Sequence, residues 1–487
     1  MQYANDNNQT NNLATGLFCA IGPLRSPLCR LLLPCRLLLP TVALFALLFA
    51  MACPNAYADV RKADVVLGAT VEAQGLTLAD CPSVEAEYAI LMDQNGNVFF
   101  ERNADAPTQI ASITKIMTAV TALDSVPTDT IIEVSENAAY IGESTAYLQP
   151  GDSMKLSDAL VAMLVPSGND SAQAIAESVG AVMLQAEGAD SSDLNACCDR
   201  FVAAMNAKSA ELGLSDTVWA YPHGLDDGIF DREQHSTARD VAKISAYAMQ
   251  KQAIRDIVSQ SHATCEIIRY GETIVGEFDS TDQILESYEG ACGIKTGYTD
   301  LAGACFAGAC NRGIDLYAIA LNSVDEWVRF EDVMAVWDWF YSHGVDVPLA
   351  TSDTLVVDTS GNTVPLVARV PAAAWMDKTI DATIADPDAT VRVFDIQGNV
   401  SQEAEYDNPG GYVHAGDIVG KITYRQRNKV VAVADLVAVQ DVPSPNILEA
   451  ITIWWNRLIG GFFDDARMAE PQLLNQMPTI NDKSAQS

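Results

Sequence analysis

Positive charge is scarce in this sequence. Lys and Arg together account for 29 of the 487 residues, whereas Asp and Glu account for 64, so the formal net charge at pH 7 is −35. Such an excess of negative charge repels the phosphate backbone of DNA and RNA. We therefore expect no nucleic-acid partner, and the composition stays compatible with peptide or cationic partners.

Histidine is also rare, with five residues, and the arrangement of the 11 cysteines does not indicate a metal site. Four cysteines precede residue 59, so 11 − 4 = 7 remain in the rest of the chain. An odd number leaves at least one thiol unpaired. We predict no metal and no cofactor, and we assign no disulfide.

A hydrophobic run long enough to cross a membrane is missing from the N-terminal region. The run from Leu37 to Ala52 is shorter than the ~20 residues that a transmembrane helix needs. Three arginines precede it, and Ala56-Tyr57-Ala58 has the small residues of a cleavage site. Residues 1–58 are therefore interpreted as a signal peptide, with an uncleaved signal anchor as the alternative, and we expect an exported protein at the outer face of the cytoplasmic membrane.

What the sequence does contain is enough apolar residues, 49%, for a large core. Residues Tyr88 to Phe100 are expected to form two strands around a turn at Asn95-Gly96, an Asn-Gly pair that favours a hairpin. From Ser112 the apolar positions recur every three or four residues, which predicts a helix, and further helices are expected before strands near Gly293 to Lys295 and Leu316 to Leu321. Residues 59–346 are thus expected to form a domain in which helices interrupt a sheet, followed by a small β-rich domain over 347–442.

The C-terminal segment is expected to contain one amphipathic helix over 443–463. Ile447 to Phe463 places aromatic and aliphatic residues on one broad face, which suits a helix lying in a membrane interface. A helix packed on the protein is the alternative. Residues 464–487 are polar and are expected to be disordered.

Ser112 and Lys115 are three positions apart at the predicted helix start, which places a hydroxyl and an amine within one turn. This is the geometry of a nucleophile and its base, but the pair alone is weak, since chance gives about one or two in a chain of this length. The order of three motifs is more specific: Ser112-Ile113-Thr114-Lys115, then Ser167-Gly168-Asn169, then Lys295-Thr296-Gly297.

With these motifs, and with Pro222-His223-Gly224-Leu225 and Ser236 to Asp240, the sequence resembles the serine D-alanyl-D-alanine carboxypeptidases of the low-molecular-mass penicillin-binding protein family. The resemblance spans about Tyr88 to Val442. It implies a β-lactamase/transpeptidase-like α/β (α+β) fold, with a central antiparallel sheet and a helical subdomain, as the catalytic domain over 59–346. It also implies peptidoglycan stem pentapeptides as substrates and β-lactams as covalent inhibitors.

The resemblance also implies roles for individual residues. Ser112 is expected as the nucleophile and Lys115 as its base, while Ser167 relays a proton and Asn169 fixes Lys115 and the substrate amide. Substrate binding is expected from four consecutive residues. Lys295 and Thr296 hold the terminal carboxylate of the substrate, and Gly297, which has no Cβ, lets the strand approach the substrate closely. The backbone N–H groups of Tyr298 and Ser112 form an oxyanion hole. His223 is expected to be structural.

The sequence departs from the family's usual pattern at Tyr221, at Cys292 and in a longer stretch over Asp226 to Gln234, and none of these departures removes a catalytic group. Three other functions share parts of this pattern. A class A β-lactamase would need a Glu-x-x-Leu-Asn stretch after Asn169, which the sequence does not show. A D,D-endopeptidase of the same superfamily uses the same chemistry and stays open. A non-catalytic penicillin-binding sensor or wall-binding module is expected to have lost Ser, Lys or Asn of the motifs, and all are present.

Overall fold

The computed structural model describes residues 61–462 and 468–480. The expected signal peptide, Phe463 and the expected tail over 464–467 and 481–487 lie outside the described residues.

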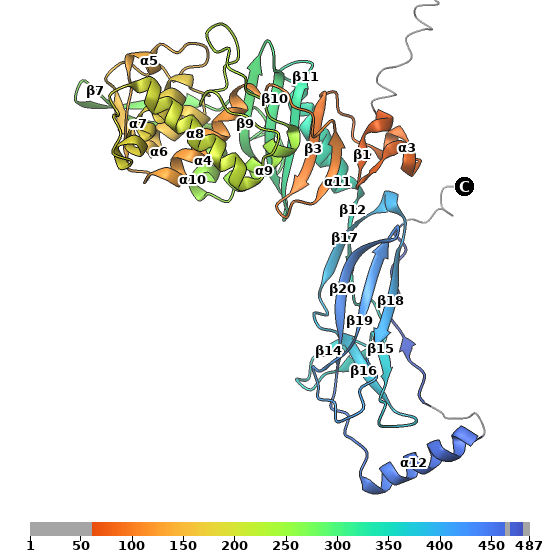
Figure 1. The fold of residues 1–487 in the computed structure, drawn as a ribbon. Coiled ribbons are helices and arrows are strands. Elements are labelled where there is room, and N and C mark those ends of the chain that lie inside the picture. Colours follow the sequence, from red (N-terminus) through yellow and green to blue (C-terminus); the bar gives the residue numbers. More distant parts are fainter. Residues whose placement is uncertain (1–60, 463–467, 481–487) are drawn as a thin grey trace, which may run out of the picture. The chain divides into compact units, whose positions relative to one another are not determined.

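A seven-stranded antiparallel sheet forms the centre of the N-terminal domain (Figure 1). Its spatial order is β2-β1-β4-β3-β11-β10-β9. Strands from before and after the helical segment pair directly, as between Tyr88 and Leu321, so the helices interrupt a sheet that begins and ends the domain, as predicted. The strands are β1 (Val65–Val66), β2 (Ala69–Thr70), β3 (Tyr88–Asp93), β4 (Val98–Arg102), β9 (Ala291–Thr299), β10 (Gly303–Asn311) and β11 (Asp315–Ser323).

The hairpin between β3 and β4 forms at the predicted Asn95-Gly96 turn. Gly96 has a φ of 82°, a conformation that costs least for glycine. The Asp93 carboxylate accepts hydrogen bonds from the backbone N–H groups of Asn95, at 2.8 Å, and Asn97, at 2.9 Å. The turn therefore fixes the register of the two strands from local contacts.

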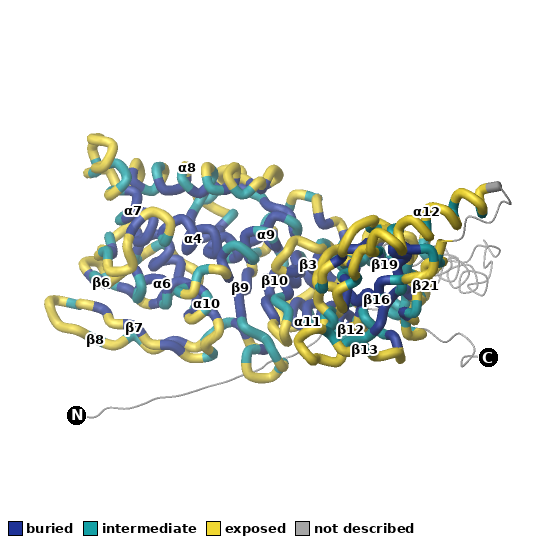
Figure 2. Tube along the Cα trace, turned by 90° about the horizontal axis from the view of Figure 1, so that it is seen from below, coloured by how far each residue is buried: buried dark blue, intermediate teal, exposed yellow. Residues whose placement is uncertain are grey.

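Both faces of the central sheet are buried, because helices cover each of them (Figure 2). In β11, Tyr317 and Ile319 belong to one hydrophobic cluster, whereas Leu316 and Ala318 belong to the other. Helix α11 (Val328–His343) packs on the second face, and α4 (Lys115–Ser125) and α9 (Ala238–Ala248) lie on the first. A sheet covered on both sides explains why these strands are apolar almost throughout.

The helical subdomain is inserted between β4 and β9. Its helices α7 and α8 approach so closely that a Cβ on Gly180 would lie 1.9 Å from the Cys197 carbonyl oxygen. A four-stranded sheet in the order β5-β6-β7-β8 flanks the helices. The remaining elements are α3 (Val71–Gln74) near the start of the domain, and α5 (Glu136–Ala139), α6 (Leu156–Leu164), α7 (Asn169–Ala186), α8 (Leu194–Leu212), α10 (Gln252–Val258), β5 (Ile131–Glu133), β6 (Ser153–Lys155), β7 (His262–Arg269) and β8 (Glu272–Asp279).

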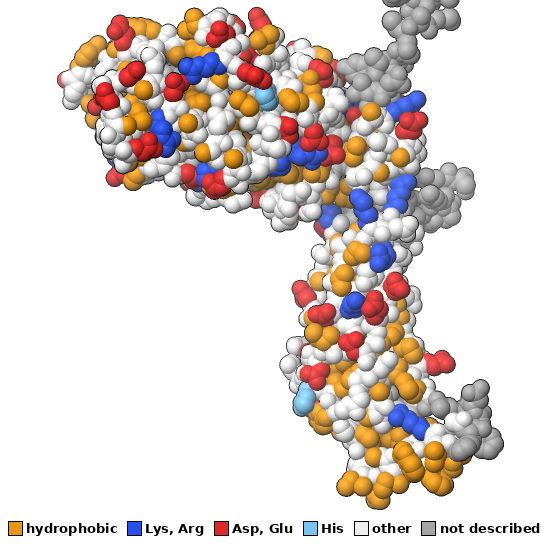
Figure 3. All heavy atoms as spheres, viewed as in Figure 1, with side chains coloured by type: hydrophobic (Ala, Val, Ile, Leu, Met, Phe, Trp, Pro, Cys, Tyr) orange, Lys and Arg blue, Asp and Glu red, His pale blue; other side chains and the backbone are white. Residues whose placement is uncertain are grey.

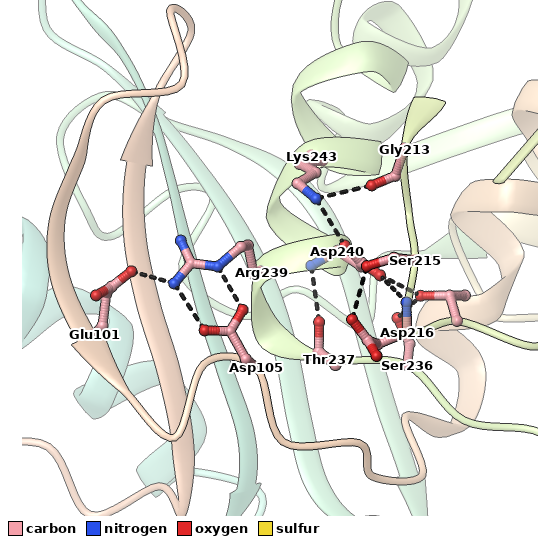
Figure 4. A network of polar contacts seen from close by, with 11 residues as sticks. Glu101, Asp105, Gly213, Ser215, Asp216, Ser236, Thr237, Arg239, Asp240 and Lys243 are labelled. Carbon is pink, nitrogen blue, oxygen red and sulfur yellow. Dashed lines mark hydrogen bonds and ion pairs between the residues drawn. The ribbon is translucent and has the colours of Figure 1, made fainter. Parts of the chain in front are cut away.

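A polar network ties the start of α9 to the sheet (Figure 4). Arg239 forms ion pairs with Glu101 of β4 and, at 2.6 Å, with Asp105. The Thr237 hydroxyl caps the helix by accepting the N–H of Asp240 at 3.1 Å, and the Asp240 carboxylate pairs with Lys243 at 3.0 Å. The Ser236 to Asp240 motif therefore connects helix and sheet.

The segment after α11 is β-rich, and with it the predicted fold class is confirmed. A six-stranded sheet has the order β18-β19-β20-β16-β15-β21, with two further strand pairs, β12-β17 and β13-β14. Its core includes Tyr424, Ile422 and Leu436. The strands are β12 (Gly344–Pro348), β13 (Leu355–Val357), β14 (Thr363–Pro365), β15 (Ala368–Pro371), β16 (Thr379–Ile384), β17 (Thr390–Phe394), β18 (Val400–Tyr406), β19 (Ile418–Gln426), β20 (Lys429–Ala438) and β21 (Gln472–Leu473).

The expectation of a disordered tail from residue 464 is wrong for residues 468–480. Strand β21 pairs with the edge of β15, through Ala368 and Leu473 among others. Asn475 is buried, donates to the carbonyl oxygen of Leu349 at 2.8 Å and accepts the N–H of Thr351 at 2.7 Å. These partners lie more than 100 residues earlier in the chain. The polar composition of residues 468–480 therefore could not show that this segment is ordered.

Helix α12 (Ile447–Phe462) forms within the predicted amphipathic segment. Strand β21, which follows α12 in the chain, pairs with the β-rich sheet, so α12 lies between two strands of that sheet, β20 and β21 (Figure 1). Among the described residues, no helix is both long and apolar enough to cross a bilayer.

Candidate active site

Ser112 lies in a 3₁₀ turn, Ala111–Thr114, and the α-helix begins only at Lys115, three residues later than the sequence pattern predicted. Ala111 has a positive φ of 48°, so the chain bends sharply before the serine. The Thr114 hydroxyl donates to the Ala111 carbonyl oxygen at 2.9 Å and holds this turn. The Ser112 oxygen lies 2.7 Å from the Lys115 amine, so the turn still brings the two groups into hydrogen-bond contact.

The Lys115 amine is completely buried, and its hydrogen-bond partners are three oxygen atoms. In addition to its contact with the Ser112 hydroxyl, it donates to the Asn169 side-chain oxygen at 2.6 Å and to the His223 carbonyl oxygen at 3.1 Å. Burial and the nearby charge of Lys295 hold its pKa well below the usual range, against the attraction of Asp170. A neutral amine has two hydrogens for the two acceptors and one lone pair for the hydroxyl of Ser112. The geometry therefore matches a base ready to take the serine proton.

The Ser167-Gly168-Asn169 loop joins α6 to α7, and Asn169 is the first residue of α7. The Asn169 amide nitrogen donates to the Gly142 carbonyl oxygen at 3.0 Å, which directs its oxygen toward Lys115. Ser167 is buried with a φ of 68°, a position that costs a non-glycine residue backbone strain. Its proton relay stays a prediction.

Asp170 was not singled out from the sequence, although it directly follows the motif. Its buried carboxylate accepts the hydroxyl of Thr145 at 2.6 Å and the backbone N–H groups of Ala146 and Leu148, both at 3.0 Å. It therefore ties the segment 142–148 to the start of α7, and its position next to Asn169 was the only sequence signal.

Strand β9 carries the four residues expected to bind substrate. Lys295 is buried and donates to the Thr296 carbonyl oxygen at 3.2 Å, and the Thr296 hydroxyl contacts that of Thr281 at 2.7 Å. A Cβ on Gly297 would lie 2.9 Å from the Ile110 carbonyl oxygen, so glycine lets the strand press against the serine turn. Tyr298 is 53% exposed at the site's mouth. The oxyanion hole formed by the N–H groups of Ser112 and Tyr298 stays a prediction.

Arg329 is a second residue that the sequence analysis did not identify. It lies in α11, is buried, and donates to the Gly297 carbonyl oxygen at 3.1 Å. Burial lowers the pKa of Arg329. Burial, and after it the charge of Arg329, lower the pKa of Lys295 to about 7. No pattern in the sequence indicated Arg329, because α11 itself was not predicted.

His223 contributes its backbone to the site, while its ring is packed away from solvent. Its Nδ1 accepts the N–H of Leu225 at 3.1 Å, and burial, with the charge of Lys115, lowers the pKa of the ring. Tyr221 stacks on the ring with centroids 5.7 Å apart, and Phe230 meets it edge-on at 4.8 Å. Tyr221 and Phe230, which lies in the stretch 226–234, thus enclose the histidine ring.

A cavity of about 140 Å³ opens in front of the serine. Its lining includes Ser112, Asn169 and Tyr298, together with three acidic residues, Glu143, Asp227 and Asp300. Lys115 and Lys295 are fully buried and are not among the residues that line this cavity. Within the described ranges no group of three or more His, Cys, Asp or Glu residues could hold a metal ion.

Comparisons with known proteins agree with this geometry. The family model described as peptidase S11, D-alanyl-D-alanine carboxypeptidase, matches residues 76–324. The chain is 24% identical over 367 residues to the D-alanyl-D-alanine carboxypeptidase DacF of Bacillus subtilis, covering 74% of this chain and 86% of that protein. It is 30% identical over 261 residues to a D-alanyl-D-alanine endopeptidase of Pseudomonas aeruginosa, covering 52% and 76%.

A solved structure, the D-alanyl-D-alanine carboxypeptidase DacD of Francisella tularensis, matches with a TM-score of 0.51 at 22% identity. The match covers 74% of this chain and 95% of that structure, and it supports the fold. Because the family model covers more than half of the chain and includes all three motifs, the chain belongs to the serine-type D-alanyl-D-alanine carboxypeptidase family, peptidase S11.

Proposed function

We propose that this protein removes the terminal D-alanine from peptidoglycan stem pentapeptides through an acyl-enzyme on Ser112. The observation that carries the proposal is the 2.7 Å contact between the Ser112 hydroxyl and the buried Lys115 amine, whose pKa is held well below its usual range by burial and by the charge of Lys295. A free hydroxyl is a poor nucleophile, and a neighbouring base at this distance activates it.

In the acylation step, Lys115 takes the hydroxyl proton as the Ser112 oxygen attacks the carbonyl carbon between the last two D-alanines. The N–H groups of Ser112 and Tyr298 stabilise the negative oxygen that develops. The peptide C–N bond then breaks, and the proton returns to the nitrogen of the departing D-alanine, with Ser167 as the relay. Lys295 and Thr296 hold the terminal carboxylate during this step.

In the deacylation step, water attacks the ester carbon, and Lys115 is placed to take the water's proton. The Ser112–carbonyl bond breaks, the serine recovers its proton, and the shortened peptide leaves with a new carboxylate. Both steps thus use the same amine, first to activate the serine and then to activate water.

Endopeptidase activity is the second candidate, because one relative is a D-alanyl-D-alanine endopeptidase. Mass spectrometry of the purified protein incubated separately with a pentapeptide and with a crosslinked dimer distinguishes the two. We expect the pentapeptide to lose the mass of one D-alanine, and the dimer to stay largely intact. Cleavage of the dimer alone would assign the endopeptidase function instead.

We also propose that the mature protein is exported and lies on the outer face of the cytoplasmic membrane through α12. Trp454 and Trp455 are 60% and 54% exposed, and Ile447, Leu448 and Ile451 are exposed beside them. Figure 3 shows these hydrophobic side chains gathered over the helix. This surface suits insertion into the headgroup region of a bilayer.

The helix is held with its apolar face outward. Arg457 donates to the backbone carbonyl oxygens of Ala373, at 2.8 Å, and Trp375, at 3.0 Å, so the polar side of α12 is fixed to the β-rich domain. A helix attached in this way presents its tryptophans without unfolding.

Substituting Trp454 and Trp455 by serine in the otherwise complete mature chain should release the protein from lipid vesicles. Each lost ring lowers partitioning by about tenfold, because the buried apolar area disappears. Vesicle co-sedimentation measures the bound fraction, with Asn456→Ser as the matched control on the other side of the helix. Unchanged sedimentation of the double variant would place the anchor elsewhere. Ending the chain at Val442 is the poorer test, since it also removes β21 from the sheet.

A further inference from the structure

Two tyrosines of the helical subdomain are almost fully exposed to solvent. Tyr147, between α5 and β6, is 80% exposed, and Tyr270, at the tip of the hairpin of β7 and β8, is 87% exposed (Figure 2). Single exposed aromatic residues are common on protein surfaces, so exposure alone assigns these two no role. Their backbone conformation and their position give further reasons.

Both tyrosines have a backbone conformation that does not favour them. The φ angle is 58° at Tyr147 and 53° at Tyr270, in the left-handed region that glycine and asparagine adopt most readily. Because Arg269 pairs with Glu272, Tyr270 and Gly271 are the two central residues of the hairpin turn. Positive φ at both positions is the pattern of a type I′ turn, which prefers Asn-Gly. A tyrosine here costs the hairpin stability, and such residues gather at functional sites.

The two tyrosines are connected by polar contacts. Arg269, directly before Tyr270, donates to the Tyr147 carbonyl oxygen at 3.2 Å and forms two hydrogen bonds, at 2.9 Å and 2.6 Å, with the buried carboxylate of Asp152. The Tyr270 hydroxyl donates to the side-chain oxygen of Gln149 at 3.4 Å. The hairpin tip is therefore fixed to the segment that contains Tyr147, and we call Tyr147 and Tyr270 together the tyrosine pair.

The tyrosine pair lies near the catalytic cavity. Ser144, three residues before Tyr147, lines that cavity together with Ser112. The Ser144 carbonyl oxygen accepts the N–H of Asn169 at 2.8 Å, so this end of the segment is fixed to the Ser167-Gly168-Asn169 motif. Consecutive Cα atoms are about 3.8 Å apart, which places the Cα of Tyr147 at most about 11 Å from that of Ser144.

We propose that the tyrosine pair binds the N-acetylated sugar rings of the glycan to which the stem peptide is attached. The proposal rests on the proposed function, because the peptide to be cleaved is the one that the glycan holds. The scissile bond follows the fourth residue of the stem, and four extended residues span at most about 14 Å. This length is similar to the separation between the cavity and the tyrosine pair, so a stem with its scissile bond at Ser112 can place its sugar over the two rings.

The chemistry of the surface fits a sugar. A tyrosine ring offers a flat apolar face to the C–H groups of a pyranose, and its hydroxyl and the nearby amide of Gln149 can hydrogen-bond to sugar hydroxyl and acetamido groups. The sugar carboxyl is consumed in the amide bond to the stem, so the glycan is uncharged. The protein's net charge of −35 therefore does not repel it.

The test compares a free pentapeptide with the same pentapeptide attached to its disaccharide, using Tyr147→Asn and Tyr270→Asn, alone and combined. Asparagine tolerates positive φ, so these variants keep the turns and remove only the rings. In the double variant we expect KM for the disaccharide pentapeptide to rise about tenfold, the effect of truncating an aromatic anchor, with kcat unchanged. Both constants for the free pentapeptide should stay the same.

Two controls separate the rings from general effects of substitution. Combined Tyr147→Phe and Tyr270→Phe keep both rings and should keep most of the affinity for the disaccharide pentapeptide. Tyr412→Asn changes an exposed tyrosine of the β-rich domain and should behave like the wild-type protein. An equal rise of KM for both substrates in the double asparagine variant, or no rise for either, would overturn the role of the tyrosine pair.

Failure of the proposed function has a different signature, because the wild-type protein then releases D-alanine from neither substrate. Calorimetric titration with glycan chains stripped of their peptides tests the tyrosine pair without catalysis. Binding that the double asparagine variant loses and the double phenylalanine variant keeps would support the pair even then. Absence of binding to the wild-type protein, or equal binding to all three proteins, would overturn it.

Discussion

Replacing Ser112 by alanine should abolish both penicillin capture and D-alanine release, with a loss of about 10⁴-fold or more. No other nucleophile is needed to account for the geometry, because the Lys115 amine contacts the Ser112 oxygen at 2.7 Å and its remaining contacts are acceptors. Peptide mapping after labelling with a fluorescent penicillin should place the adduct on Ser112 alone.

The matched control is Ser125→Ala, at the other end of α4, where the hydroxyl only donates to the Thr121 carbonyl oxygen. It should label like the wild-type protein. Labelling that persists in Ser112→Ala would reject this serine as the nucleophile.

The arginine variants of the two buried lysines should diverge, although both side chains face one site. Lys115 must lose its charge to accept a proton, and arginine does not deprotonate in this pH range. Lys115→Arg should therefore lower the acylation rate by about 10³-fold or more at every pH, because general-base catalysis is lost. Lys295→Arg keeps a cation near the carboxylate and should lower the rate by only about 10- to 100-fold, through poorer fit.

The pH dependence gives a second readout of the same division of roles. In the wild-type protein, acylation should rise as Lys115 loses its proton and fall as Lys295 loses its own, since the pKa of Lys295 is lowered to about 7. Arginine at position 295 stays protonated, so the alkaline fall should disappear in Lys295→Arg. Stopped-flow acylation across pH measures both variants, and comparable rates in the two would contradict the assignment of the base.

The parts of the fold that the sequence predicted depend on local contacts. The hairpin at Asn95-Gly96 was predictable because residues of the turn form its hydrogen bonds. The contact between Ser112 and Lys115 was predictable because three residues span less than one helical turn. The position of the helix start was wrong by three residues, because Ala111 bends the chain into a 3₁₀ turn first.

The parts that escaped prediction depend on distant partners. Helix α11 buries Arg329 and Asp332 together with its aromatic residues, so its buried face is not purely apolar and the helical pattern is blurred. Asp332 is satisfied by the N–H of Ala86 at 2.9 Å and by the hydroxyl of Ser323 at 2.7 Å.

The return of the chain after α12 has a consequence for the order in which the protein is completed. A chain delivered from its N-terminus presents β15 early, paired on one side with β16, as between Ala368 and Ala382. The other edge of β15 keeps unpaired N–H and C=O groups until β21 arrives about 100 residues later. The six-stranded sheet thus reaches its full width only after the amphipathic helix has emerged, so this edge of β15 stays open until α12 has been made.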